Sequence, residues 1–208
     1  MTTPYPVHYS IDPPPTFSRF QLLIRIVAFI AIGTLGLSFG AVFGFLYLVL
    51  PAYAATRLSA QADHPTSYAA EDGPRVLRLL RWFAAISAWT GLIAEHLPAR
   101  TPDETVRVSI DGAPRRLTPG GALVRVITGL PSALTLGFLC WIGVLVWLWA
   151  ALTILVGERV GPRAFRYLAG LQRWSIRLLA YQAGLVDDYP PFSFADGPSA
   201  FPMARAMA

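Results

Sequence analysis

PSALTLGFLCWIGVLVWLWAALTILV, residues 131–156, decides the fold, because these 26 residues include no charged side chain. The hydrocarbon core of a bilayer is roughly 30 Å thick, and about 20 helical residues cross it. A second apolar stretch occupies residues 22–50, where Arg25 is the only charged residue. The sequence therefore predicts a mainly α-helical integral membrane protein with spans at 22–50 and 131–156.

The composition of the chain also favours lipid surroundings. Of 208 residues, 54% are hydrophobic and 14% are charged, whereas soluble domains average about 45–50% and about 25%. The net charge is +5, and all 17 basic residues are arginine, whose guanidinium group matches phosphate and carboxylate geometry. We therefore expect anionic lipid headgroups or acidic partners. Nucleic acid is excluded, because the arginines lie beside apolar runs and not on a soluble basic face.

The elements on either side of the spans recur in the same order, which indicates a tandem repeat followed by a tail. Each repeat combines a short alternating strand, a span and an Arg-bearing helix. The expected bounds are: first repeat 1–100, with strand 7–12, span 22–50 and helix 75–96; second repeat 101–192, with strand 105–111, short helix 120–130, span 131–156 and helix 163–186; tail 193–208.

Short matches within these elements carry the repeat. Leu23-Ile24-Arg25-Ile26 corresponds to Leu123-Val124-Arg125-Val126, Arg81-Trp82 to Arg173-Trp174, Gly91-Leu92 to Gly184-Leu185, and Glu95 to Asp188. Two arrangements follow. Parallel units place both strands on one side of the membrane, where they can pair, and inverted units place them on opposite sides. We favour parallel units, because a lone strand is marginally stable.

The last helix carries a narrow cationic seam on an otherwise apolar surface. At 100° per residue its members fall within about 80° of arc: Arg163, Arg166, Arg173, Arg177, Tyr181 and Asp188. An arginine at membrane depth costs roughly 2.5–3.5 kcal/mol, so the seam needs carboxylates, carbonyls, water or phosphates. One interpretation is that these arginines pair with acidic residues of the chain. The other is that an anionic headgroup or a partner subunit docks on the seam.

Catalytic signals are missing from the sequence. Cys140 is the single cysteine, and the three histidines are far apart and lack metal-ligand spacing. We therefore expect no catalytic residue, metal site or cofactor, and no enzymatic activity. The sequence favours an accessory or scaffolding subunit of a larger membrane complex, with other membrane subunits as partners. A small oligomeric channel or carrier for anions is the alternative. We expect a multi-pass protein of the bacterial cytoplasmic (inner) membrane.

Arg173-Trp174-Ser175-Ile176-Arg177, followed by Tyr181 and then Asp188-Tyr189-Pro190-Pro191-Phe192, resembles a family of bacterial membrane proteins, the domain of unknown function 4389. Gly157 to Arg163 is similar to that family's junction after the span. The sequence departs from the pattern at Ser132, where the family has histidine after proline, and at His96-Leu97-Pro98, where the first unit lacks the Tyr-Pro-Pro-Phe ending. The resemblance implies the tandem fold and no known reaction, substrate or cofactor.

Overall fold

The computed structural model describes residues 5–34, 39–60, 67–111 and 117–194. The predicted tail 193–208 lies outside these residues from position 195 onward. The described chain is mostly helical. In order, its elements are β1 (Val7–Ser10), α1 (Arg19–Thr34), α2 (Phe39–Ala60), α3 (Ser67–Glu71), α4 (Gly73–Thr90), the 3-10 turn η1 (Pro102–Glu104), β2 (Arg107–Ile110), α5 (Pro119–Gly157) and α6 (Pro162–Gln182).

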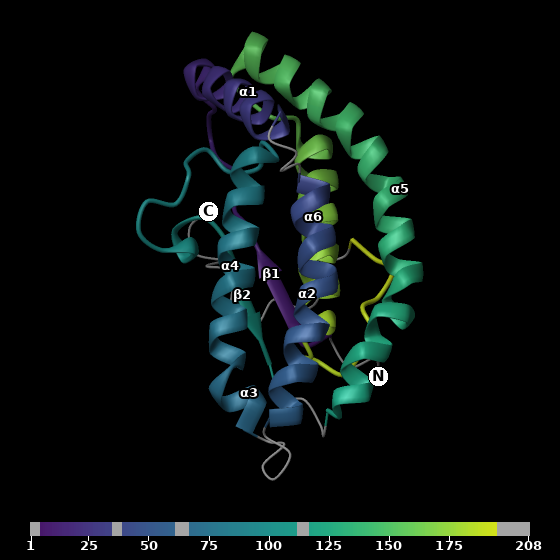
Figure 1. Ribbon diagram of the computed structural model, residues 1–208. Helices are drawn as coiled ribbons and strands as arrows, with labels where there is room; N and C mark the ends of the chain where they lie inside the picture. The colour runs from purple at the N-terminus through teal and green to yellow at the C-terminus, as the bar shows by residue number, and fades with distance from the viewer. Residues whose placement is uncertain (1–4, 35–38, 61–66, 112–116, 195–208) are drawn as a thin grey trace, which may run out of the picture.

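Both predicted spans differ from the observed helices. The single span predicted at 22–50 is divided between α1, which ends at Thr34, and α2, which begins at Phe39 and continues to Ala60. The expected short helix 120–130 and span 131–156 are joined in α5 as one curved helix (Figure 1). Pro131 lies inside it. A proline within a helix removes one hydrogen bond and bends the helix without having to end it. The hydroxyl of Tyr189 lies 3.2 Å from the backbone nitrogen of Ser132, directly after the proline, and accepts a hydrogen bond from it. The predicted break is therefore a supported bend.

Both Arg-bearing helices end earlier than predicted, α4 at Thr90 and α6 at Gln182. Beyond each end one residue has left-handed backbone geometry, Leu92 with φ 58° and Gly184 with φ 72°. Left-handed residues at this position terminate helices by redirecting the next amides to the last free carbonyls. The predicted strands shorten to Val7–Ser10 and Arg107–Ile110.

The two strands pair with each other, as the preference for parallel units predicted, but the helices of the two halves run in opposite directions. Ala54 near the end of α2 packs in one cluster with Ala122 near the start of α5. A Cβ on Gly73, which begins α4, would lie 3.7 Å from Leu185, just beyond the end of α6. The two strands also run antiparallel to each other, with Val7 opposite Ile110.

The small sheet lies against the middle of the helices and not at one end of them (Figure 1). Its register pairs Tyr9 with Val108. The Tyr9 hydroxyl donates to Gln172 of α6 at 2.8 Å, and Arg81 of α4 donates to the Val108 carbonyl at 2.9 Å. The strand layer expected on one side of the membrane is therefore level with the centres of α4 and α6.

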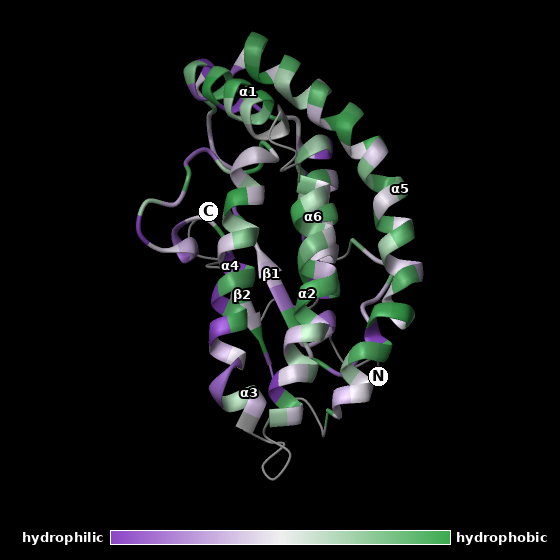
Figure 2. Cartoon of the chain, viewed as in Figure 1, coloured by the Kyte–Doolittle hydropathy of each residue, from purple (hydrophilic) through white to green (hydrophobic). Residues whose placement is uncertain are grey.

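Burial divides the helices into two kinds. Every α6 residue from Leu168 to Gln182 is buried, although this helix carries Arg173 and Arg177. In contrast, α5 keeps large apolar side chains exposed, including Trp141 at 78% and Phe138 at 69%. Figure 2 shows α5 and α1 as mostly hydrophobic ribbons on the outside of the body. The most apolar helix is therefore among the least covered.

Glycines recur at three and four residues in the first span, at positions 33, 36, 40 and 44, and this spacing predicts a small-residue face for helix packing. Gly36 lies outside the described residues, and a Cβ on Gly44 would meet nothing within 4 Å. The close approach is in α5, where a Cβ on Gly129 would lie 2.2 Å from the amide nitrogen of Gln182. Gly137, two turns later in the same helix, faces open space.

Replacing Gly129 by alanine should destabilise the fold. Overpacking of this kind costs about 1–3 kcal/mol, since Gln182 must leave its hydrogen bond to the Arg125 carbonyl. The matched control is Gly137→Ala, which gains up to about 1 kcal/mol in helix propensity without a clash. Thermal unfolding in detergent measures both variants. Equal effects of the two changes would contradict the close contact.

A buried carboxylate fixes the junction between α2 and α4. The Asp72 carboxylate accepts hydrogen bonds from the Arg57 guanidinium at 2.7 Å and the Tyr53 hydroxyl at 2.9 Å, and Arg75 lies 3.7 Å away. Burial alone would raise the pKa of Asp72, but these hydrogen bonds and the two positive charges together hold its pKa below its ordinary value.

This lowered pKa predicts acid sensitivity. The Asp72 carboxylate stabilises the fold above its unfolded pKa of about 3.9, and that contribution is lost as the pH falls through the lower folded pKa. Asp72→Asn should therefore reduce the unfolding temperature at neutral pH, and the gap to the unmodified protein should narrow in acid. Asp12→Asn, on an exposed residue, is the control. If the difference in unfolding temperature between the two proteins stayed constant across pH, the charge of the Asp72 carboxylate would be ruled out as the source of the stabilisation.

Candidate functional site

The predicted seam separates into exposed and buried parts. Arg163 and Arg166 are exposed in the first turns of α6. Arg173 and Arg177 are 7% and 2% exposed in the middle of the same helix. Tyr181 is buried at its end, and Asp188 is exposed in the segment that follows. The six residues therefore share a helix face without forming one continuous surface.

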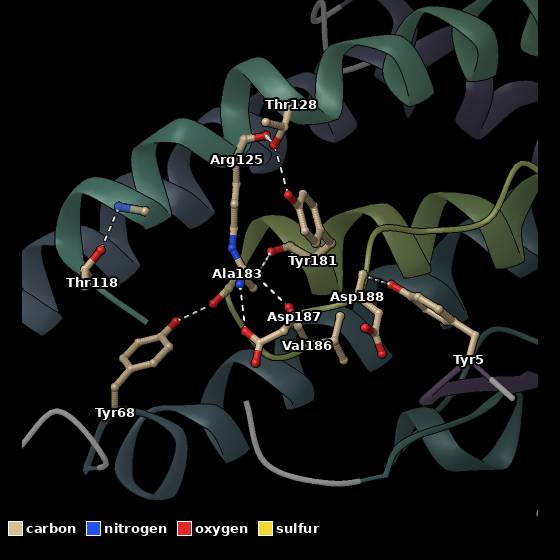
Figure 3. A network of polar contacts seen from close by, with 11 residues as sticks. Tyr5, Tyr68, Thr118, Arg125, Thr128, Tyr181, Ala183, Val186, Asp187 and Asp188 are labelled. Atoms are coloured by element: carbon tan, nitrogen blue, oxygen red, sulfur yellow. Dashed lines mark hydrogen bonds and ion pairs between the residues drawn. The ribbon is translucent and has the colours of Figure 1, made fainter. Parts of the chain in front are cut away.

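The buried arginines of the seam hold the N-terminal strand segment against α6. Arg173 donates through Nε to the Tyr9 carbonyl at 3.4 Å and through a terminal nitrogen to the Phe194 carbonyl at 2.5 Å. The Arg177 guanidinium lies 5.5 Å from the centre of the Tyr5 ring, within the range of a cation–π contact. Tyr5 in turn donates its hydroxyl proton to the Asp188 carbonyl at 3.1 Å (Figure 3).

Arg81 of α4 makes the counterpart of the Arg173 contact with the other strand. Its Nε donates to the Val108 carbonyl, and Val108 is the register partner of Tyr9. Each Arg-bearing helix therefore binds the strand of the opposite half. Arg81 also lies 3.7 Å from the Asp103 carboxylate, so its charge is balanced near the surface.

A second kind of arginine contact joins the start of α5 to the end of α6. Arg125, 7% exposed, donates to the carbonyls of Tyr181 and Val186, both at 2.6 Å, and to the Asp187 carboxylate at 3.0 Å. Its guanidinium also lies 4.7 Å from the centre of the Tyr181 ring. Figure 3 shows these groups converging on the arginine. Free carbonyls make a helix C-terminus partly negative, so a buried cation is stabilised there.

Arg25 makes the same set of contacts in the first half. Its guanidinium donates to the Glu95 carbonyl, lies 3.6 Å from the Glu95 carboxylate, and lies 5.4 Å from the Trp89 ring. Each arginine at the start of an apolar stretch thus meets an aromatic ring, carbonyls and one carboxylate at the end of the Arg-bearing helix. We call these two sets the Arg25 clamp (Arg25, Trp89, Glu95) and the Arg125 clamp (Arg125, Tyr181, Val186, Asp187).

The clamps correct the register of the predicted repeat by one residue. The predicted correspondence paired Glu95 with Asp188 and Leu92 with Leu185. In the structure Glu95 makes the contact with Arg25 that Asp187 makes with Arg125. Leu92 and Gly184 each have left-handed backbone geometry at equivalent positions. Sequence reasoning matched Arg25 with Arg125 but missed their targets, because carbonyl groups leave no mark in a sequence.

A cavity of about 610 Å³ lies among α2, α4, α5 and α6, and the sequence did not predict it. Its lining is largely apolar, with Phe43, Leu136 and Trp147 among its walls. Two polar lining residues already bond each other, since Gln172 donates to the Ser87 hydroxyl at 2.6 Å. Within the described ranges, no cluster of three or more His, Cys, Asp or Glu residues could hold a metal ion.

The Arg125 clamp predicts a large loss of stability when its arginine is removed. Arg125→Gln removes a buried charged donor from the Asp187 carboxylate and from two carbonyls, and a hydrogen bond to a charged group is worth about 1.5–3 kcal/mol. Arg163→Gln, on an exposed arginine of α6, should change stability by no more than about 0.5 kcal/mol. Unfolding in detergent measures both. Similar small losses in the two variants would show that the clamp contributes little.

Comparison with known proteins places part of the chain in a family. Residues 120–193 match the family model described as "Domain of unknown function (DUF4389)". The match begins at the second residue of α5 and ends after the Tyr-Pro-Pro-Phe segment, so it includes the whole Arg125 clamp. No curated protein and no solved structure matches the chain. The match supports assigning residues 120–193, in the second half of this chain, to the DUF4389 family.

Proposed function

We propose that this chain is a non-catalytic integral membrane protein that acts as an accessory or scaffolding subunit of a larger membrane assembly. The observation that carries the proposal is the exposed apolar surface of α1 and α5, which we call the apolar face. Its most exposed members include Phe20, Ile30, Ile127, Leu134, Phe138, Trp141, Leu145 and Val156. Soluble monomers rarely expose contiguous apolar patches beyond a few hundred Å². Lipid is the solvent that suits such a surface.

Two helices satisfy the requirements of a membrane span. Phe39–Ala60 and Pro119–Gly157 are long and apolar enough to cross by length and composition. Only 17% of the most apolar α5 window is buried within the chain, whereas the core helix of a soluble protein is mostly buried. The bacterial inner membrane and the number of crossings stay predictions.

The tandem repeat is part of the proposal, and the paired contacts support it. The Arg25 and Arg125 clamps each combine an aromatic ring, at least one backbone carbonyl and a carboxylate, with the ring before the carboxylate in the chain. Arg81 and Arg173 bind carbonyls of strand residues that are register partners. A two-fold relation between the halves accounts for both pairs. If the halves were unrelated, the two similar clamps and the two similar arginine–strand contacts would each need a separate explanation.

The surface next to the end of α5 is basic and suits a partner. Arg163 and Arg166 are exposed beside the apolar end of α5 and are available to a phosphate headgroup or an acidic subunit. An anion pathway has less support, because the described lining of the 610 Å³ cavity includes no charged residue. Scaffolding therefore remains the better supported of the two roles.

Purification in mild detergent followed by native mass spectrometry tests the proposal. We expect the chain to carry bound anionic lipid or another membrane subunit. Arg163→Gln with Arg166→Gln should weaken anionic lipid binding on the order of tenfold, because each arginine near the surface contributes about 1 kcal/mol. The control is Arg100→Gln with Arg107→Gln, an equal change of charge on exposed residues elsewhere. A lone monomer without lipid or partner would contradict the proposed function.

A further inference from the structure

The apolar face along α5 is longer than a membrane crossing accommodates. Large apolar side chains are exposed from Leu123 (52%) to Val156 (81%). These 34 residues extend about 50 Å at 1.5 Å per residue. The hydrocarbon core is roughly 30 Å thick. Even at the steepest common tilt, about 40°, the stretch would project about 38 Å onto the membrane normal. A crossing α5 would therefore leave apolar turns among headgroups or in water.

The side of the molecule away from α5 is polar at the same level. Leu171 of α6 lies under Gly143 near the middle of α5, and Arg173, two residues later, contacts Tyr9 of β1. Residues two apart on a helix point in different directions. The sheet and α5 therefore lie on different sides of α6 at one level along its axis.

Exposed charge accompanies the sheet at this level. Arg107 in β2 is exposed, as are Asp103 and Glu104 in the turn η1 before it. If α5 crossed the bilayer, these groups would lie near its centre, where each charge costs roughly 2.5–3.5 kcal/mol. The outer edges of a two-stranded sheet also present backbone groups that lipid cannot satisfy. A crossing orientation is therefore unfavourable for the sheet, as it is for the length of α5.

From these two constraints we infer that α5 lies along one leaflet of the bilayer and does not cross it. This inference rests on the membrane location proposed above. The apolar face is immersed in the acyl chains of that leaflet, and the sheet and η1 stay in water on the same side. Both ends of α5 then face one compartment. The two-fold axis runs along the membrane normal, so the two strands share one side although their helices are antiparallel.

The same placement gives the exposed arginines a common role. Arg75 and Arg78 are exposed at the start of α4, and Arg163 and Arg166 at the start of α6. Because α4 and α6 are antiparallel, these pairs lie at opposite ends of the body (Figure 1). With α5 along the leaflet, both pairs border the phosphate groups of the same membrane surface.

Cysteine accessibility at the two ends of α5 tests the inference. Gly120 and Gly157 are exposed, and a Cβ on either would meet nothing within 4 Å, so single cysteines there leave the packing unchanged. The background is Cys140→Ala. In sealed vesicles of both orientations, a membrane-impermeant maleimide should label Gly120→Cys, Gly157→Cys and the sheet position Arg107→Cys from the same side. Labelling of the two α5 ends from opposite sides would overturn the inference and leave the proposed function intact.

Depth measurement covers the case in which a cysteine is immersed and unreactive. Gly137, between the other two glycines, also faces open space. Nitroxide labels at Gly120, Gly137 and Gly157 can be compared by their exposure to oxygen and to a water-soluble nickel chelate. We expect similar depths within one leaflet. A Gly137 label at the midplane between two shallow ends would overturn the inference. Labels with no exposure to lipid would overturn the membrane location itself.

Discussion

Arg125 and Arg25 direct their guanidinium groups at backbone carbonyls as much as at carboxylates, and the rest of the structure depends on this choice. The last carbonyls of a helix have no partner within it. When the helix end is buried, those carbonyls must be bonded elsewhere. An arginine at the beginning of an apolar stretch supplies several donors at once. The hydrogen bonds that it makes also offset the free-energy cost of burying its own charge. Each clamp therefore fixes where an apolar helix begins relative to where its companion ends.

The strand contacts extend the same principle across the molecule. A two-stranded sheet is marginally stable by itself, and these strands are four residues each. Arg81 and Arg173 bind carbonyls at matched positions in the two strands. The sheet is therefore held from both flanks by cations on helices. This explains how the part of α6 from Leu168 to Gln182 can be buried although it contains Arg173 and Arg177, because their guanidinium groups meet carbonyls and aromatic rings and not hydrocarbon.

Much of the fold could be predicted from the sequence, and the reasons for the misses are physical. Runs without charge located most of α5, but in the first half they predicted one span where the structure has α1 and α2, and alternation located both strands. Pro131 could either start or kink the second span, and the sequence did not show that Tyr189 would support a bend there. A leucine at position 92 does not indicate a helix end in the sequence. Gly184 does, because glycine is the residue type that favours left-handed backbone geometry. For the candidate site, arginine spacing was visible, but the carbonyls that receive Arg125 and Arg173 occur in every residue and carry no sequence signal.

The pairing of β1 with β2 has a consequence for synthesis of the chain. Val7 meets Ile110, so about 100 residues separate the appearance of the first strand from that of its partner, on the order of 5–20 s at ribosomal rates. In the same way, Arg25 is synthesised well before Glu95, the residue with which it pairs. During this interval α1 and α2 already exist without their polar partners. Synthesis of the first helices and closure of the fold are thus separate events in time, because the partners of the first half lie in residues that are made later.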